Sequence, residues 1–185
     1  YTLSLHDALP ILLFLSGSIP SSMPDDAYQK IMAMLDGRGV RIAVDATRDL
    51  LMKVLPYHPF LIKPNNHELG EMFGTVCKTD EDIVHYAKKL QEKGAVNVLI
   101  SMAGDGAILI TEDGQNIKMG TPKGKVVNSV GAGDSMVAGF ITGYIRGGNY
   151  EEALKSGTAA GSATAFSEGL ASLEMYEKML KQITE

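Results

Sequence analysis

The chain has 185 residues, of which 45% are hydrophobic and 21% are charged, a composition typical of a globular protein with a buried core. Its net charge of −5 and its lack of a basic run argue against nucleic acid as a partner, and its longest apolar run, residues 8–15, is too short to span a membrane. The single cysteine, Cys77, excludes an internal disulfide and favours the reducing cytoplasm.

The first ten residues show neither a helical nor a strand period, and the chain does not begin with Met. We expect residues 1–10 to be unstructured or foreign to the protein, and we expect the chain to begin inside a longer protein. The folded part is then residues 11–185, which are long enough for one domain.

Strand and helix patterns alternate along residues 11–185. Apolar or β-branched runs predict strands at residues 11–15, 40–44, 60–62, 96–100, 107–111 and 117–119. Amphipathic patterns predict a first helix that is capped by Asp25 or Asp26 and ends near residue 36. They predict further helices at residues 50–55, 67–73, 80–93, 135–146, 151–166 and 173–183, and Asp80 is expected to cap the helix of residues 80–93. This alternation with short connections predicts an α/β fold with a doubly wound, mostly parallel sheet flanked by helices.

Residues of suggestive chemistry follow the predicted strands. They are residues 16–18, Asp45, residues 63–68, residues 101–106 and Asp134. Ligands of doubly wound sheets bind at the carboxyl ends of the strands. We therefore expect these residues to share one site.

The segment Gly131-Ala132-Gly133-Asp134-Ser135 has the parts of a phosphoryl-transfer centre. Glycines allow close backbone approach, and the free N–H groups at a helix start favour an anion. Asp134 is placed to take a proton from a hydroxyl beside that anion. A helix N-cap after a glycine turn is an equally good interpretation of these residues alone. Met136 stands where a dinucleotide fingerprint needs a small residue, which disfavours an NAD-dependent oxidoreductase.

Taken with Lys63-Pro64-Asn65-Asn66-His67-Glu68, this segment resembles the PfkB family of carbohydrate kinases, which have the ribokinase-like fold. The resemblance runs from about residue 11 to the C-terminus. Ser16-Gly17-Ser18-Ile19-Pro20 resembles the phosphosugar branch, and residues 45–47, 59–65 and 67–71 look like those of bacterial 1-phosphofructokinases. The resemblance implies a phosphotransferase that uses ATP to convert fructose 1-phosphate to fructose 1,6-bisphosphate. Tagatose-6-phosphate kinase and 6-phosphofructokinase activities are the alternatives within the family.

The resemblance also implies roles for individual residues. Asp134 matches the general base, and the N–H groups of Ala132, Gly133 and Asp134, which follow Gly131, match the anion hole. Asn65 and Glu68 match the N-x-x-E element, which acts on Mg²⁺ largely through water. The other implied ATP-binding residues are Lys63, Ser101, Gly104, Asp105, Gly106 and Ser162, Ser18 is implied to contact the phosphosugar, and residues 167–169 match a loop for K⁺.

Plainer interpretations of the same residues stay open. Asn-x-x-Glu alone is most often a helix start, residues 101–107 alone are as well explained by a turn between strands, and Ala and Gly in residues 151–166 suit close helix packing. Asp45 suits a cap as well as a place in the Mg²⁺ or phosphate network. A non-catalytic nucleotide-binding fragment is the competing functional hypothesis.

Family members carry further strands and a β lid before the Ser-Gly-Ser loop, and we expect this chain to lack both. The resemblance implies a homodimer for the full-length protein. The fragment alone is expected to bind sugar poorly, because the basic residues that grip the sugar phosphate lie upstream in the family.

Overall fold

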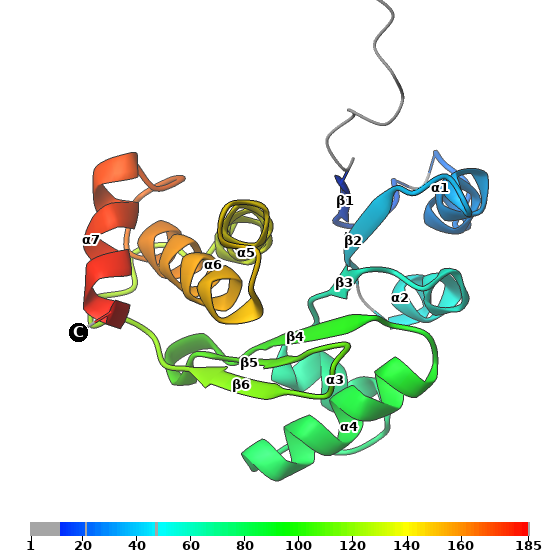
Figure 1. The fold of residues 1–185 in the computed structure, drawn as a ribbon, viewed down its shortest axis with the longest axis horizontal. Coiled ribbons are helices and arrows are strands. Elements are labelled where there is room, and N and C mark those ends of the chain that lie inside the picture. The colour runs from blue at the N-terminus through cyan, green and yellow to red at the C-terminus, as the bar shows by residue number, and fades with distance from the viewer. Residues whose placement is uncertain (1–11, 21, 47, 185) are drawn as a thin grey trace, which may run out of the picture.

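The computed structural model describes residues 12–20, 22–46 and 48–184, so the expectation for residues 1–10 lies outside the described residues. Within them, six strands form one sheet in the order in which they occur in the chain (Figure 1). The strands are β1 (Leu12–Ser16), β2 (Arg41–Asp45), β3 (Leu61–Ile62), β4 (Asn97–Ser101), β5 (Ala107–Ile110) and β6 (Asn116–Met119). Strands β1 to β4 pair in parallel, whereas β5 and β6 are antiparallel additions. The predicted α/β fold with a mostly parallel sheet is confirmed.

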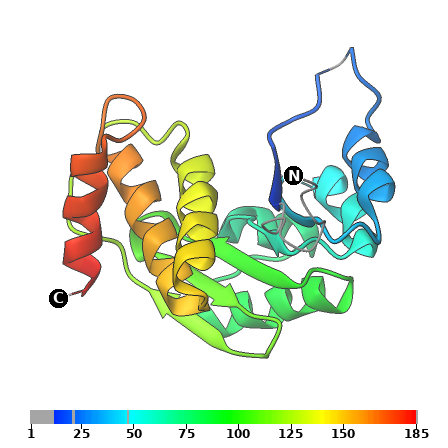
Figure 2. The same cartoon turned by 45° about the horizontal axis from the view of Figure 1, so that its top comes forward.

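Helices cover both faces of the sheet (Figures 1 and 2). One face packs against α1 (Ala27–Leu35), α2 (Arg48–Val54), α3 (Asn66–Met72) and α4 (Asp80–Glu92), and the other packs against α5 (Ala132–Gly147) and α6 (Tyr150–Ala165). The last helix, α7 (Leu173–Thr184), packs on α6, and two short 3₁₀ turns, η1 (Leu55–Tyr57) and η2 (Ala103–Asp105), complete the set in the described part of the chain.

The two faces follow from the alternation of side chains along each strand. In β2, Ile42 and Val44 belong to the core under α1 to α4, while Ala43 between them belongs to the core under α5 and α6. Leu99 of β4 likewise faces α5 and α6. Burial on both faces explains why these strands read as continuous apolar runs in the sequence.

Close packing joins α5 to α6. A Cβ atom on Gly139 would lie 2.7 Å from the Ser156 carbonyl oxygen and 2.7 Å from Ala160 Cβ, and one on Gly157 would lie 2.8 Å from the Met136 carbonyl oxygen. The small residues of α6 therefore let the two helices touch through their backbones, as the packing interpretation of this segment expects.

The predicted start of α5 and the predicted cap of α4 are wrong. Helix α5 begins at Ala132 and not at residue 135, because Gly131 takes the left-handed conformation (φ +79°) and its carbonyl accepts the first helical bond from Ser135 N–H at 2.9 Å. Helix α4 is capped by Thr79 and not by Asp80, since Thr79 Oγ1 accepts from Asp82 N–H and the Asp82 carboxylate accepts from Thr79 N–H. Asp26 holds the N-cap position of α1 without a side-chain capping bond. In the described part of the chain, no helix is long and apolar enough to span a bilayer.

Candidate active site

The carboxyl ends of β1, β2 and β3 bring three of the expected segments together. Ser16 ends β1 in register with Asp45, which ends β2, and Gly17 N–H donates to the Asp45 carbonyl at 3.0 Å. Lys63 follows β3, and its buried side chain reaches Asp45, with Nζ 3.1 Å from Oδ2. Asp45 thus forms an ion pair with Lys63.

The first turn of α5 meets this ion pair. A Cβ atom on Gly133 would lie 3.1 Å from Lys63 Nζ and 3.6 Å from Asp45 Oδ2, so a glycine at this position leaves the helix start close to both groups. Among the described residues, the N–H groups of Gly133 and Asp134 have no backbone acceptor, whereas Ala132 N–H donates to the Ser129 carbonyl at 3.2 Å. Two of the three expected anion-hole N–H groups are therefore free, and the helix dipole adds partial positive charge beside them.

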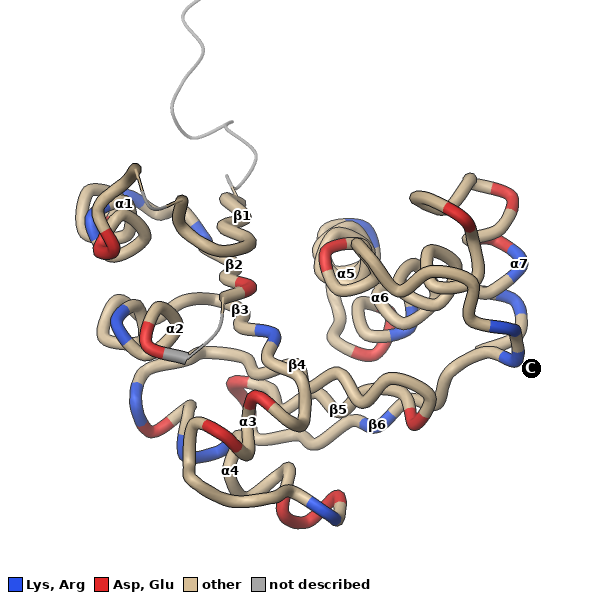
Figure 3. The backbone as a smooth tube through the Cα atoms, turned by 180° about the vertical axis from the view of Figure 1, so that it is seen from behind, with Lys and Arg blue, Asp and Glu red and all other residues tan. Residues whose placement is uncertain are grey.

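The Asp134 carboxylate lies on the exposed side of this turn and accepts a hydrogen bond from Ser16 Oγ, 118 residues earlier in the chain. Figure 3 shows acidic and basic positions at the ends of β2 and β3 and on α5. The hydroxyl of Tyr28, from α1, donates to the carbonyls of Ser16 and Gly17 at 2.5 and 3.2 Å. These contacts tie the end of β1 to both α1 and α5.

The electrostatics of the site are set by three carboxylates around one lysine. Burial raises the pKa of Asp45, the Lys63 ammonium opposes that rise, and the charges of Asp134 and Glu68 add to it. The site is therefore short of positive charge, which suits the arrival of a cation. In the described part of the chain, no three His, Cys, Asp or Glu residues gather closely enough to hold a metal by themselves. This donor set fits Mg²⁺ that takes most of its ligands from phosphates and water.

The Asn65–Glu68 element starts α3 with a reciprocal capping box. Asn65 Oδ1 accepts from Glu68 N–H and Glu68 Oε2 accepts from Asn65 N–H, both at 2.8 Å. The interpretation of Asn-x-x-Glu as a helix start is thus confirmed. The two capping hydrogen bonds hold the Asn65 and Glu68 side chains beside the segment that carries Lys63. A bridge between Asn65 and Ser101, with Ser101 N–H 3.2 Å from the Pro64 carbonyl, brings the next expected segment alongside.

The predicted nucleotide loop forms the tight connection from β4 to β5. Ala103 has a positive φ of +49°, and Gly106 has a φ of +95° with the Met119 carbonyl oxygen only 2.0 Å from where a Cβ atom would be. The carbonyl of Gly104 accepts a hydrogen bond from Thr121 Oγ1 at 2.8 Å, and Gly104 and Asp105 are exposed. The approach of Gly106 to the Met119 carbonyl and the bond from Thr121 to Gly104 therefore fix the shape of the loop. Its exposed turn lies at the same end of the sheet as Ser101.

Two further candidate residues, Ser162 and Ser18, lie on other segments than the ion pair of Lys63 and Asp45. Ser162 is buried on α6, and Thr164, two residues later, donates to Ser135 Oγ at 2.9 Å and so links α6 to the first turn of α5. The segment before α5 is tied to the end of α6 as well, because Asn128 Nδ2 donates to the Glu168 carbonyl at 3.1 Å. Ser18 is exposed in the loop after β1.

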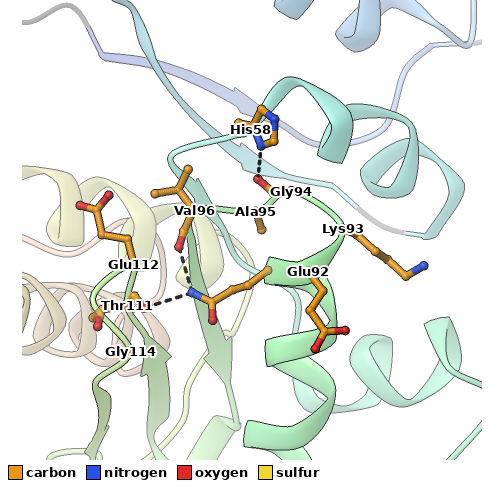
Figure 4. A pocket seen from close by; sticks show the side chains of 10 residues that line it. His58, Glu92, Lys93, Gly94, Ala95, Val96, Thr111, Glu112 and Gly114 are labelled. Atoms are coloured by element: carbon orange, nitrogen blue, oxygen red, sulfur yellow. Dashed lines mark hydrogen bonds between the residues drawn. The ribbon is translucent and has the colours of Figure 1, made fainter.

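A hollow of about 460 Å³ lies at the opposite, amino-terminal edge of the parallel strands and contains none of the expected site residues (Figure 4). Two of its polar side chains form internal hydrogen bonds: His58 Nδ1 with the Gly94 carbonyl, and Gln91 Nε2 with the carbonyls of Val96 and Thr111. The residues able to bind and transfer a phosphoryl group therefore lie away from the hollow. We assign the candidate site to these residues and not to the hollow.

Sequence reasoning missed two side chains that touch the site. Ser16 was grouped with the loop after β1 but was given no role, and Tyr28 was not singled out. Ser16 has a signal in the sequence, since it ends a strand next to Gly17, but Tyr28 has none, because its contact depends on how α1 returns over the sheet.

Comparison with known proteins identifies the family. Residues 10–175 match the model of the pfkB family of carbohydrate kinases. The chain belongs to this family. It is 48% identical over 172 residues to 1-phosphofructokinase of Bacillus subtilis, covering 93% of this chain and 56% of that protein. It is 39% identical over 172 residues to D-tagatose-1-phosphate kinase of Bacillus licheniformis, covering 92% and 56%.

Solved structures agree with this assignment. A Staphylococcus aureus protein assigned as a phosphofructokinase superposes with a TM-score of 0.88 at 45% identity, covering 92% of this chain and 56% of its own. Arabidopsis thaliana ribokinase, at 24% identity, shares the fold with a TM-score of 0.78 over 92% of this chain and 55% of its own. The ribokinase-like fold is thus confirmed, and the chain spans little more than half the length of the curated relatives it matches.

Proposed function

We propose that the protein is an ATP-dependent kinase that transfers the γ-phosphoryl group to the 6-hydroxyl of fructose 1-phosphate and yields fructose 1,6-bisphosphate. The observation that carries the proposal is the meeting, at the start of α5, of the Asp134 carboxylate, two free N–H groups and the Lys63 ammonium. Phosphoryl transfer needs charge neutralisation and alignment more than covalent chemistry, and this arrangement supplies both.

In the proposed mechanism, Asp134 accepts the proton of the sugar hydroxyl as its oxygen attacks the γ-phosphorus. The N–H groups of Gly133 and Asp134 donate to the transferring group, where they stabilise charge that develops in the transition state. Lys63, already aimed at the same turn, leaves its ion pair with Asp45 to reach the triphosphate. The bond from the γ-phosphorus to the bridging oxygen breaks, and ADP leaves.

Mg²⁺ supplies charge neutralisation on the triphosphate when bound, and Glu68 and Asn65 would hold it largely through water. Ser101, Gly104, Asp105, Gly106 and Ser162 complete the proposed nucleotide contacts, Ser18 the sugar contact and residues 167–169 a K⁺ loop. A cytoplasmic location and a homodimer of the full-length protein belong to the same proposal.

D-Tagatose 1-phosphate is the second candidate substrate, because a relative of that name is 39% identical over 92% of this chain. Both sugars are ketohexose 1-phosphates and offer a hydroxyl at the same end of the molecule. This alternative differs from the tagatose 6-phosphate expected from the sequence in the position of the phosphate.

The experiment measures sugar-dependent ADP release by the full-length protein with each ketohexose phosphate. Asp134→Asn should lower the rate by roughly 10²–10⁴-fold, the usual cost of losing a general base. Asp36→Asn, at the C-cap of α1 on the other edge of the sheet, is the matched control and should stay within about twofold. ATP binding without sugar-dependent ADP release would favour the non-catalytic nucleotide-binding alternative.

A further inference from the structure

Two side chains that have no role in the mechanism above touch the Asp134 region from other elements. Ser16, the last residue of β1, donates its hydroxyl hydrogen to Asp134 Oδ1. The hydroxyl of Tyr28, from α1, donates to the carbonyls of Ser16 and Gly17. The first contact is directional, because it engages one carboxylate oxygen and leaves Oδ2 for a second hydrogen-bonding partner.

We propose that Ser16 is a positioning residue that holds the Asp134 carboxylate in the orientation for proton abstraction, and that Tyr28 holds Ser16. This inference rests on the proposed kinase function. An exposed aspartate rotates freely about its side-chain torsions, and a general base works only within hydrogen-bond reach of the proton it takes. Anchoring Oδ1 restricts that rotation and directs Oδ2 toward the sugar hydroxyl.

The anchor itself is rigid. Ser16 lies in register with Asp45, and Gly17 N–H donates to the Asp45 carbonyl at 3.0 Å. Tyr28 adds its two bonds, at 2.5 and 3.2 Å. Burial raises the pKa of Tyr28, and the charges of Asp45 and Asp134 raise it further, so the phenol keeps its proton and stays a donor throughout the working pH range. The Ser16 hydroxyl is thus presented from a strand end fixed on two sides.

The charged groups that face Asp134 do not replace this contact. Asp45 and Tyr28 approach it from β2 and α1, and Lys63 lies beside Gly133 but forms an ion pair with Asp45 at 3.1 Å. Because Lys63 is shared with Asp45 and with the incoming triphosphate, the serine hydroxyl is the donor dedicated to the base.

Steady-state kinetics of the full-length protein test the inference. Ser16→Ala should lower kcat roughly tenfold to hundredfold, the cost expected for a misplaced catalytic group, with the KM for ATP within about twofold. Ser16→Thr, which keeps the hydroxyl, should restore most of the rate, and Tyr28→Phe should give a smaller fall in kcat. Ser22→Ala, in the exposed turn before α1, is the matched control.

The outcomes are separable. A wild-type protein without sugar-dependent ADP release would overturn the proposed function, and the inference with it. An active wild type whose kcat is unchanged in folded Ser16→Ala would overturn the inference alone. A rise in kcat would also overturn it, since it would mean that Ser16 competes with the sugar for Asp134. If Ser16→Ala fails to fold, an unchanged kcat in Tyr28→Phe overturns the inference.

Discussion

The carboxyl-terminal and amino-terminal edges of the parallel strands use their polar groups in opposite ways. At the carboxyl-terminal edge, Lys63 pairs with Asp45, and the N–H groups of Gly133 and Asp134 at the start of α5 are free, so charge and donors remain for a ligand. At the amino-terminal edge, His58 bonds a backbone carbonyl, Gln91 bonds two, and Asn97 joins the Phe60 carbonyl to the Glu112 N–H. The hydrogen-bonding groups of these three side chains hold neighbouring segments together and are not available to a ligand.

This difference teaches that open hydrogen-bonding capacity marks the site better than empty volume does. The hollow of about 460 Å³ lies at the edge where His58 and Gln91 are already hydrogen-bonded to backbone carbonyls (Figure 4). Similar substitutions should therefore cost stability at the amino-terminal edge and activity at the carboxyl-terminal edge. Residues of the same type at the two edges allow direct tests.

The largest expected effect is on stability, from Gly94→Ala at the amino-terminal edge. Gly94 has a φ of +127°, and a Cβ atom there would lie 2.0 Å from the Leu55 carbonyl oxygen, which is backbone and cannot swing away. We expect the free energy of unfolding to fall by more than about 3 kcal/mol, measured by urea denaturation. Gly114→Ala, with a φ of +84° but no atom within 4 Å, is the control and should cost about 1–2 kcal/mol. Equal losses would contradict the clash as the cause.

The next effect is on activity, from Gly133→Ala at the carboxyl-terminal edge. The nearest atom to a Cβ there is Lys63 Nζ at 3.1 Å, the end of a flexible side chain, so the helix tolerates alanine and stability changes by at most about 1 kcal/mol. Displacing Lys63 and crowding the free N–H groups should lower kcat/KM for ATP by about 10²-fold. Gly120→Ala, which meets no atom within 4 Å, is the control. A loss of stability with normal activity would reverse the comparison.

The difference between these two glycines also marks what sequence can predict. Continuous apolar runs predicted the strands and, by their alternation with helical patterns, the α/β class, because burial on both faces of a sheet leaves a local signature. Glycine before a carboxylate predicted the turn at Gly131, but not that α5 begins at Ala132, since Ala132 and Gly133 carry no apolar period. The cap of α4 was placed one residue late for a similar reason, because Thr79 and Asp80 are both good caps and only the reciprocal bonds decide.

Contacts between distant segments were beyond local patterns. The Ser16–Asp134 bond joins residues 118 positions apart, and the Tyr28 bonds depend on how α1 returns over β1. Most of the candidate site residues have a local signal, because they follow a strand or begin a helix, whereas Ser162 lies inside α6. Their mutual geometry depends on sheet order, which the sequence does not encode locally.

A tyrosine pair gives the third test. Tyr150 on α6, at the amino-terminal edge, donates to Glu112 Oε1 at 2.5 Å, and burial, followed by this bond, raises its pKa. Its counterpart at the other edge, Tyr28, touches the site. Tyr150→Phe should lower the free energy of unfolding by about 1 kcal/mol at neutral pH and leave kcat within about twofold, whereas Tyr28→Phe should lower kcat.

The alkaline limb sharpens the tyrosine test. Unfolded tyrosine ionises near pH 10, whereas native Tyr150 keeps its proton to higher pH, so its stabilisation is present below about pH 10 and is lost as pH rises further. Denaturation curves of Tyr150→Phe should therefore show a shallower alkaline loss than those of the wild type. An identical alkaline loss would show that the Glu112 contact is not formed in solution.

The smallest expected effect is a change in pH slope, and it compares two aspartates that both pair with lysine. Burial raises the pKa of Asp45, whereas the hydrogen bond from Lys53 lowers the pKa of the exposed Asp25. The native state therefore holds the Asp45 proton to higher pH than the unfolded chain, and the Asp45 contribution to stability is present below about pH 4 and is lost as pH rises through the native pKa. The Asp25 contribution to stability has the opposite pH dependence: it increases as pH rises and is fully present above about pH 4.

Denaturation as a function of pH separates these signs. The stability of Asp45→Asn relative to the wild type should improve as pH rises above about 4, and that of Asp25→Asn should worsen as pH rises toward and past its own pKa range. Parallel curves for the two variants would mean that the Lys63 ammonium affects the pKa of Asp45 more than burial does, whereas the structure indicates that burial has the larger effect. In that case the carboxyl-terminal edge would hold a satisfied ion pair, as the amino-terminal edge holds satisfied hydrogen bonds, and Lys63 would not be free to move to the triphosphate.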